Sequence, residues 1–158
     1  MNKSNNSQAD WLALYKKYDS WQEVHQGYRA EIRRVVHPDD LIEVPAYYRL
    51  AQGFRPGEGL RRLVYCLPFL KHQDNGMSLG RALAQPVHKV NEKRLFMVMR
   101  TQAPNDLIQL RRLLQQVKPT VDFNRTAWLL LQWDKPEKKQ TLLEDFFLYQ
   151  NDTAKTQS

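Results

Sequence analysis

Cysteine and long uncharged runs are both scarce in this 158-residue sequence, and each scarcity excludes a class of protein. The single cysteine, Cys66, can form no intramolecular disulfide and supplies no cysteine-rich zinc site. The longest runs without a charged residue, 63–70 and 126–133, have eight residues each. A membrane span needs roughly 18 apolar residues, so we expect no membrane partner.

The first ten residues, MNKSNNSQAD, are polar and contain no apolar core, so we expect neither a signal peptide nor a transit peptide. Together with the lone cysteine, this favours a cytoplasmic location. The chain has 42% hydrophobic and 11% aromatic residues, enough to build a core. We expect a single domain over 1–158, or two small lobes that share a core, with 1–9 and 150–158 disordered.

Positive charge is concentrated in the middle of the chain rather than in a tail. The formal net charge of the whole sequence is +7. Residues 26–125 contain all 13 arginines and four lysines against nine acids, a net charge of +8. Arginine is favoured where planar contact with phosphates or bases matters, and a clustered basic surface is typical of nucleic-acid-binding proteins. The composition therefore favours a polyanionic partner over a merely positive surface.

Apolar residues recur at helical spacing along most of the chain, and alternation typical of strands is scarce. Asp10 is a suitable N-cap for the first helix, which Gly27 is predicted to end, and Asp122 is suitable for a later one. The pattern predicts an all-α protein with about eight short helices. The predicted helical segments are 10–24, 30–36, 46–51, 60–67, 78–84, 91–100, 105–117, 123–133 and 136–149.

Helical wheels for two of these segments predict which basic residues face solvent. In 105–117 the leucines gather on one side, so Arg112 points away from them and Arg111 lies on the flank. In 91–100 the outer half carries Lys93, Arg94 and Arg100, with Met97 among them. Each segment is therefore expected to expose basic side chains, as suits an anionic strand with a protein neighbour close by.

No constellation for catalysis is present in the sequence. The four histidines lie at no metal-binding spacing, and the nearest pattern, His72 with Asp74, is better explained as a loop histidine beside a turn-forming aspartate. Cys66 lies in an apolar run, which favours a buried, inert thiol. We therefore expect no enzyme, no cofactor, no metal and no small-molecule substrate.

Seven strings, taken in order, resemble the CasB family, the small subunits of the type I-E CRISPR Cascade surveillance complex. The resemblance runs from about residue 29 to 149. The strings are AEIRRV (30–35), PDDL with PAYYRL (38–41, 45–50), LVYCL (63–67), SLGRALA (78–84), NEKRLF (91–96), QLRRLL (109–114) and LLEDF (142–146).

This resemblance implies an all-α protein of two helical lobes without catalytic activity. It implies assembly with other Cascade subunits, the CRISPR RNA and a second copy of the chain. It also implies that a basic groove holds the displaced, single-stranded non-target DNA and so stabilises the R-loop in antiviral defence. By the same resemblance, the residues that contact this strand correspond to Arg34, Arg94, Arg100 and Arg112, with Arg33, Lys93 and Arg111 as neighbours.

Two other functions remain open from the residues alone. A helical adaptor would use the same basic face to meet an acidic protein partner, without direct contact with nucleic acid. A metal-dependent nuclease built around Asp74 is the weaker alternative. The loops at 53–59 and 71–77 are short compared with the resembling family, so a contribution from them to the basic groove is left open.

Overall fold

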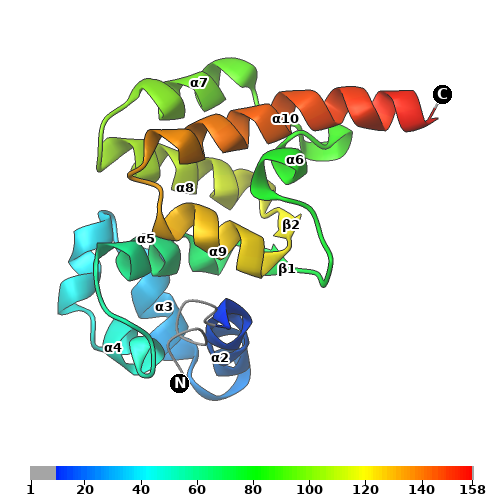
Figure 1. Ribbon diagram of the computed structural model, residues 1–158. Helices are drawn as coiled ribbons and strands as arrows, with labels where there is room; N and C mark the ends of the chain where they lie inside the picture. Colours follow the sequence, from blue (N-terminus) through cyan, green and yellow to red (C-terminus); the bar gives the residue numbers. More distant parts are fainter. Residues whose placement is uncertain (1–9, 158) are drawn as a thin grey trace, which may run out of the picture.

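The computed structural model describes residues 10–157, and most of them are helical (Figure 1). Three short 3-10 helices connect the longer elements: η1 (Pro38–Glu43), η2 (Leu67–Phe69) and η3 (Pro86–His88). The all-α class predicted from the sequence is confirmed. The α-helices are α2 (Trp11–Val24), α3 (Gln26–Arg34), α4 (Pro45–Ala51), α5 (Glu58–Cys66), α6 (Leu79–Leu83), α7 (Glu92–Arg100), α8 (Asn105–Val117), α9 (Phe123–Leu131) and α10 (Pro136–Gln157).

Several of these helices begin at the residues that the sequence indicated. The Asp10 carboxylate accepts a hydrogen bond from the Leu12 amide at the start of α2, at 3.1 Å. The Asp122 carboxylate does the same for the Asn124 amide at the start of α9. These side chains satisfy amides that have no partner within their helix, which fixes where each helix begins.

The first helix ends where the sequence predicted, but the second begins earlier than predicted. α2 ends at Val24, within the predicted segment 10–24, whereas α3 begins at Gln26 rather than at residue 30, so Gly27 lies inside α3 and does not end the first helix. His25 separates them because its backbone leaves the helical region, with φ −134° and ψ 55°. A glycine within a helix is tolerated at a cost of about 1 kcal/mol relative to alanine.

The last helix is also longer than predicted. The sequence indicated an end near Tyr149 and a disordered tail over 150–158, whereas α10 continues through Gln157. The predicted end of the last helix is therefore wrong, while Ser158 and the segment 1–9, also predicted to be disordered, lie outside the described residues.

A two-stranded parallel sheet, which the sequence did not predict, joins distant parts of the chain. Strand β1 (Lys71–His72) pairs with β2 (Thr120–Val121), with Lys71 opposite Thr120 and His72 opposite Val121. Strands of two residues are too short to produce a recognisable alternation. The pairing sets the loop before α6 against the turn that follows α8.

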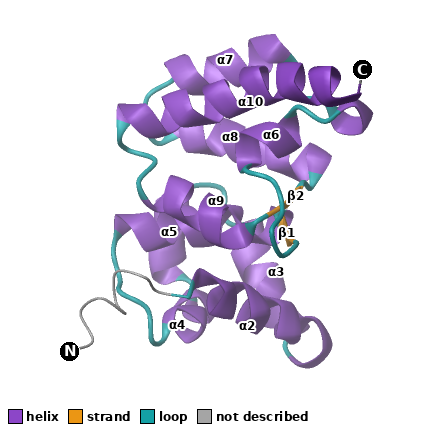
Figure 2. Cartoon of the chain, turned by 45° about the vertical axis from the view of Figure 1, so that its right-hand side comes forward, coloured by secondary structure: helices purple, strands orange, loops and turns teal. Residues whose placement is uncertain are grey.

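The helices form two groups that share one core. Helices α6, α7, α8 and α10 lie together at one end of the molecule, and α2, α3 and α4 lie at the other, next to α5 and α9 (Figures 1 and 2). Within the first group α10 packs on α6 and α7 packs on α8, while α5 packs on both α9 and α8. The buried apolar residues form one cluster that includes members of both groups.

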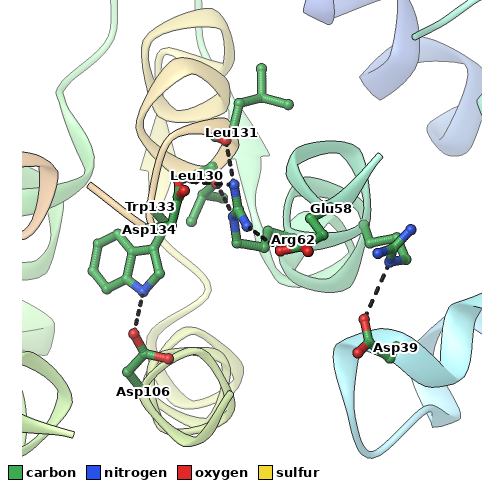
Figure 3. Close-up of polar contacts among 9 residues, drawn as sticks. Asp39, Glu58, Arg62, Asp106, Leu130, Leu131, Trp133 and Asp134 are labelled. Carbon is green, nitrogen blue, oxygen red and sulfur yellow. Dashed lines mark hydrogen bonds and ion pairs between the residues drawn. The ribbon is translucent and has the colours of Figure 1, made fainter. Parts of the chain in front are cut away.

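Two charged side chains, the half-buried Arg62 and the buried Asp106, bond to residues at the end of α9 or just after it (Figure 3). Arg62 on α5 donates to the carbonyls of Leu130 and Leu131, at 3.1 and 2.6 Å, and so caps the end of α9. Asp106 on α8 is buried and accepts a hydrogen bond from the Trp133 indole at 3.1 Å. It also pairs with Lys139 of α10 at 2.9 Å.

Candidate nucleic-acid interface

Helices α7 and α8 pack side by side and leave a groove of about 180 Å³ between their outer faces. Leu95 and Val98 of α7 are buried, which turns the opposite side of that helix to solvent. The residues that line the groove, all of them described by the structure, include no carboxylate. They are Arg94, Met97, Val98, Gln109, Arg112 and Leu113.

The structure brings two of the predicted site residues together at this groove. Arg94 on α7 and Arg112 on α8 both line it, and both are exposed. The Arg94 guanidinium donates to the side-chain oxygen of Gln116, at 2.8 Å. Because the amide of Gln116 is neutral, this bond holds the arginine across α8 without cancelling its charge.

Two further predicted residues extend the positive charge along α7. Lys93 and Arg100 are exposed, although neither lines the groove. The Arg100 guanidinium lies over the Phe96 ring, 5.5 Å from its centroid. Met97, which the sequence placed among these residues, is 56% exposed. We call Lys93, Arg94, Arg100 and Arg112 the basic stripe.

Arg33 and Arg34 lie on a different element, in the last turn of α3. Both side chains are exposed, and Nε of Arg34 donates to the carbonyl of Ala30 at 3.2 Å. Cations in the last turn interact favourably with the negative end of a helix. Neither arginine lines the groove between α7 and α8 in the described structure.

Arg111 differs from the sequence prediction, which placed it on the flank of its helix as a neighbour of the strand-contacting residues. Its side chain is buried, with the residue only 4% exposed. Its guanidinium donates to the carbonyls of Tyr65, Val35 and Ile32, at 2.8, 2.6 and 3.2 Å, and to that of Arg33 at 3.1 Å. All its nitrogens are occupied inside the protein, so it is not available to a nucleic-acid strand.

The buried guanidinium of Arg111 connects α8 with the end of α3, the two helices that carry Arg112 and the pair Arg33 and Arg34. It rests against two aromatic rings, 4.1 Å from the centroid of Tyr65 and 5.0 Å from that of Phe69. Burial lowers the pKa of Arg111, but an arginine in a protein stays charged. Its bonds cap the carbonyl end of α3, so Arg111 fixes the turn that carries Arg33 and Arg34 against α8, next to Arg112.

The wheel reasoning missed two amide side chains at the interface. Gln109 lines the groove and Gln116 holds Arg94. Both lie within about 60° of Arg112 on α8, at the spacing of neighbouring turns. The helical wheel that predicts an exposed Arg112 places both amides on the same face, but an uncharged amide does not stand out in a search for basic residues.

His72 and Cys66, the residues considered above for metal binding and catalysis, have structural roles. His72 accepts a hydrogen bond from the Phe123 amide through Nδ1 at 3.0 Å, and its Nε2 lies 2.7 Å from a carboxylate oxygen of Asp74. Cys66 is buried, and burial raises the pKa of its thiol to about 12. Within residues 10–157 the structure contains no group of three metal-binding side chains and no helix long and apolar enough to cross a membrane.

The model of the family "CRISPR-associated protein Cse2" matches residues 28–147, which include the basic stripe and most of both helical groups, while α2 lies before the matched range. The chain belongs to the Cse2 family. A curated relative, the CRISPR system Cascade subunit CasB of Escherichia coli (strain K12), is 42% identical over 92% of this chain and 97% of its own length. The predicted resemblance to the CasB family is thereby confirmed.

A chain of a solved structure has the same fold. This chain matches one from the crystal structure of E. coli Cascade bound to a PAM-containing double-stranded DNA target. The match has a TM-score of 0.78 and 43% identity, over 89% of this chain and 96% of the other. That relative is thus found in a Cascade assembly with DNA.

Proposed function

We propose that this chain is the non-catalytic small subunit of a cytoplasmic Cascade complex and holds the displaced DNA strand of the R-loop. Its partners would be other Cascade subunits, the CRISPR RNA and a second copy of itself. The family supports this proposal, since the curated relative is a Cascade subunit and the solved relative belongs to a Cascade bound to double-stranded DNA.

The observation that carries the proposal is the groove between α7 and α8. Arg94 of α7 and Arg112 of α8 both line it, with no carboxylate among the residues that line it in the described structure. Lys93 and Arg100 add exposed charge along α7. Arginine binds phosphate through planar, bidentate hydrogen bonds, and such contacts hold a backbone without reading its sequence.

A small number of such contacts can serve the proposed role because the free energy of R-loop formation is close to zero. The RNA–DNA duplex that forms is about as stable as the DNA duplex that it replaces. A few phosphate contacts to the displaced strand can therefore shift the equilibrium. Arg33 and Arg34 would extend the contact beyond the groove, since Arg111 fixes the end of α3 against α8.

Met97 favours a second candidate, a protein–protein adaptor. This side chain is 56% exposed and lines the groove between the arginines. An apolar residue in that position suits contact with a protein neighbour. In that case the basic stripe would meet an acidic partner, and binding to free single strands would be weak or absent.

The test is single-stranded DNA binding by the purified chain, measured by fluorescence anisotropy at several salt concentrations. The variant Arg94→Ala/Arg100→Ala/Arg112→Ala removes three charges from the basic stripe. A matched control, Lys16→Ala/Arg125→Ala/Lys135→Ala, removes three exposed charges that lie on α2, on α9 and before α10. Loss of the counterion release from three phosphates should reduce the slope of log K against log salt by about 2.

We expect the stripe variant to lose several kcal/mol of binding free energy and each single variant about 1 kcal/mol. The control should retain most of the parent's affinity. Equal binding by the stripe variant and the parent would contradict the proposal that the strand binds at the groove. Binding by the parent with no dependence on salt would favour the adaptor.

A further inference from the structure

A second and larger hollow lies between the loop after β1, helix α6 and the end of α8. It has a volume of about 550 Å³. Lys71, Arg81 and Lys118 line it together with the uncharged side chains of Gln73, Asn75 and Gln85. β1, β2 and α6 lie at the same side of the molecule in Figures 1 and 2. We call this hollow the basic pocket.

The two lysines of the basic pocket have no carboxylate beside them on its walls. The lining, drawn entirely from described residues, contains Lys71, Lys118 and Arg81 and no carboxylate, and Arg81 takes part in an interaction of its own. Lys71 and Lys118 are exposed and belong to none of the ion pairs formed within the described part of the chain. A concave surface lined by one sign of charge concentrates ions of the opposite sign. The pocket is therefore suited to an anion.

Backbone hydrogen bonds hold the walls of the pocket in place. The Lys71 amide donates to the Pro119 carbonyl at 3.0 Å, and the Gln73 amide donates to Val121 at 2.9 Å. On the facing segment Lys118 has a left-handed backbone, with φ 48°, and its amide donates to the Leu114 carbonyl at 2.7 Å. Two segments far apart in the sequence thus present their lysines from a fixed backbone, which lowers the entropic cost of binding.

Gly76 shows how closely the loop after β1 packs against the segment after β2. A Cβ at this position would lie 2.8 Å from the Gln73 carbonyl oxygen and 3.1 Å from the Asp122 amide nitrogen. Only a residue without a side chain fits there without displacing backbone. The wall that carries Gln73 and Asn75 is accordingly rigid rather than a free loop.

We infer that the basic pocket binds backbone phosphate of single-stranded nucleic acid, as a second contact beyond the basic stripe; this inference rests on the proposed function. The two sites are continuous along α8. Gln116 holds Arg94 of the stripe, and the next two residues, Val117 and Lys118, line the pocket. Arg112 and Val117 are separated by about 8 Å along the axis of α8, at 1.5 Å per residue, and Lys118 follows directly after the helix.

The uncharged side chains favour nucleic acid over an acidic peptide. Gln73, Asn75 and Gln85 place amide donors and acceptors beside the cations. The side-chain nitrogen of Gln85 donates to the Arg81 carbonyl at 2.9 Å, which leaves its oxygen as an acceptor. Sugar and base atoms require both donors and acceptors, whereas carboxylates require donors only.

The test compares three variants of the full chain in the anisotropy assay with a 15-nucleotide oligothymidylate. Lys71→Gln/Lys118→Gln removes the pocket lysines and keeps polar side chains of similar length. Lys16→Gln/Lys135→Gln removes two exposed lysines elsewhere, and the triple alanine variant removes the basic stripe. The pocket variant should lower the slope of log K against log salt by about 1.4, the value for two phosphate contacts on a single strand. The control should bind as the parent does.

The outcomes separate the two proposals. If the stripe variant loses binding while the pocket variant equals the parent, the pocket inference fails and the proposed function stands. If only the pocket variant loses binding, the pocket is supported and the stripe is not. If the parent does not bind, both fail. Displacement of the oligothymidylate from the pocket by oligoglutamate, at the potency of unlabelled DNA, would overturn the inference in favour of an acidic protein partner.

Discussion

Arg111 and Arg112 are adjacent in the sequence and lie in opposite environments. Arg111 is buried and donates to four carbonyls, whereas Arg112 is exposed at the groove. The wheel predicted the exposure of Arg112 correctly because the leucines of α8 define its inner face. It could not predict that the end of α3 and the carbonyl of Tyr65 would cover the flank of α8, because that contact joins residues far apart in the chain.

The first prediction concerns this pair. Arg111→Ala leaves four carbonyls without their donor, so we expect the free energy of unfolding to fall by about 3 kcal/mol or more. Arg112→Ala should change it by less than about 0.5 kcal/mol, since its side chain is exposed. Urea denaturation of both variants measures the difference. Equal stability of the two variants would contradict the structural role of Arg111.

The second prediction uses the buried thiol of Cys66. Burial raises its pKa from the ordinary 9.0 to about 12 in the folded protein. Between these values the unfolded chain binds fewer protons than the folded one, so stability falls as pH rises. We expect a loss of about 1 kcal/mol between pH 8 and pH 10, seen by urea denaturation.

Cys66→Ala supplies the control for this pH dependence, because it removes the thiol. Its free energy of unfolding should change less between pH 8 and pH 10 than that of the parent. Burial also raises the pKa values of Tyr18, Tyr47 and Tyr65 above their ordinary 10.0, so these residues add their own loss of stability as pH approaches 10, equally in parent and variant. Parallel pH profiles for parent and variant would show that the thiol does not contribute.

At the scale of elements, the sequence predicted helices well where a side chain caps them. Asp10 and Asp122 marked the starts of α2 and α9, and the structure has these hydrogen bonds. The end of α2 at Val24 was predicted correctly, but the start of α3 at Gln26 was missed, because a glycine at position 27 favours a break rather than a helix. The pairing of β1 with β2 was missed because two-residue strands have no pattern of their own, and their contact depends on the packing of the helices around them.

The third prediction tests the packing of α6 on α10. A Cβ on Gly80 would clash with the Leu142 carbonyl oxygen and lie 2.8 Å from Cβ of Asp145. Gly80→Ala should therefore push these helices apart and lower the free energy of unfolding by about 1–3 kcal/mol. Gly27→Ala is the matched control, because nothing lies within 4 Å of a Cβ there and α3 is helical. The Gly27→Ala variant should be as stable as the parent or more stable by up to about 1 kcal/mol.

A Gly80→Ala variant as stable as the Gly27→Ala control would show that α6 does not approach α10 so closely.

At the scale of the whole molecule, charge counting and wheels located the basic stripe but not the basic pocket. Lys93, Arg94, Arg100 and Arg112 could be predicted as exposed because each belongs to one amphipathic helix. The pocket could not, because Lys71 and Lys118 come together only through the pairing of β1 with β2. Helical periodicity describes residues close in the sequence, so it does not predict which short, distant segments pair with each other.

The fourth prediction tests the central claim, that the basic stripe holds the displaced strand. Cascade is assembled with the parent chain or with the Arg94/Arg100/Arg112 triple alanine variant, and its affinity is measured for a double-stranded target and for the complementary single strand alone. Only the double-stranded target releases a displaced strand.

We expect the variant complex to assemble normally and to bind the complementary single strand as the parent complex does. Its affinity for the double-stranded target should fall at least tenfold, which corresponds to about 1.4 kcal/mol. The Lys16/Arg125/Lys135 control should match the parent for both targets. Unchanged affinity for the double-stranded target, or an equal loss for both targets, would contradict the claim that the stripe holds the displaced strand.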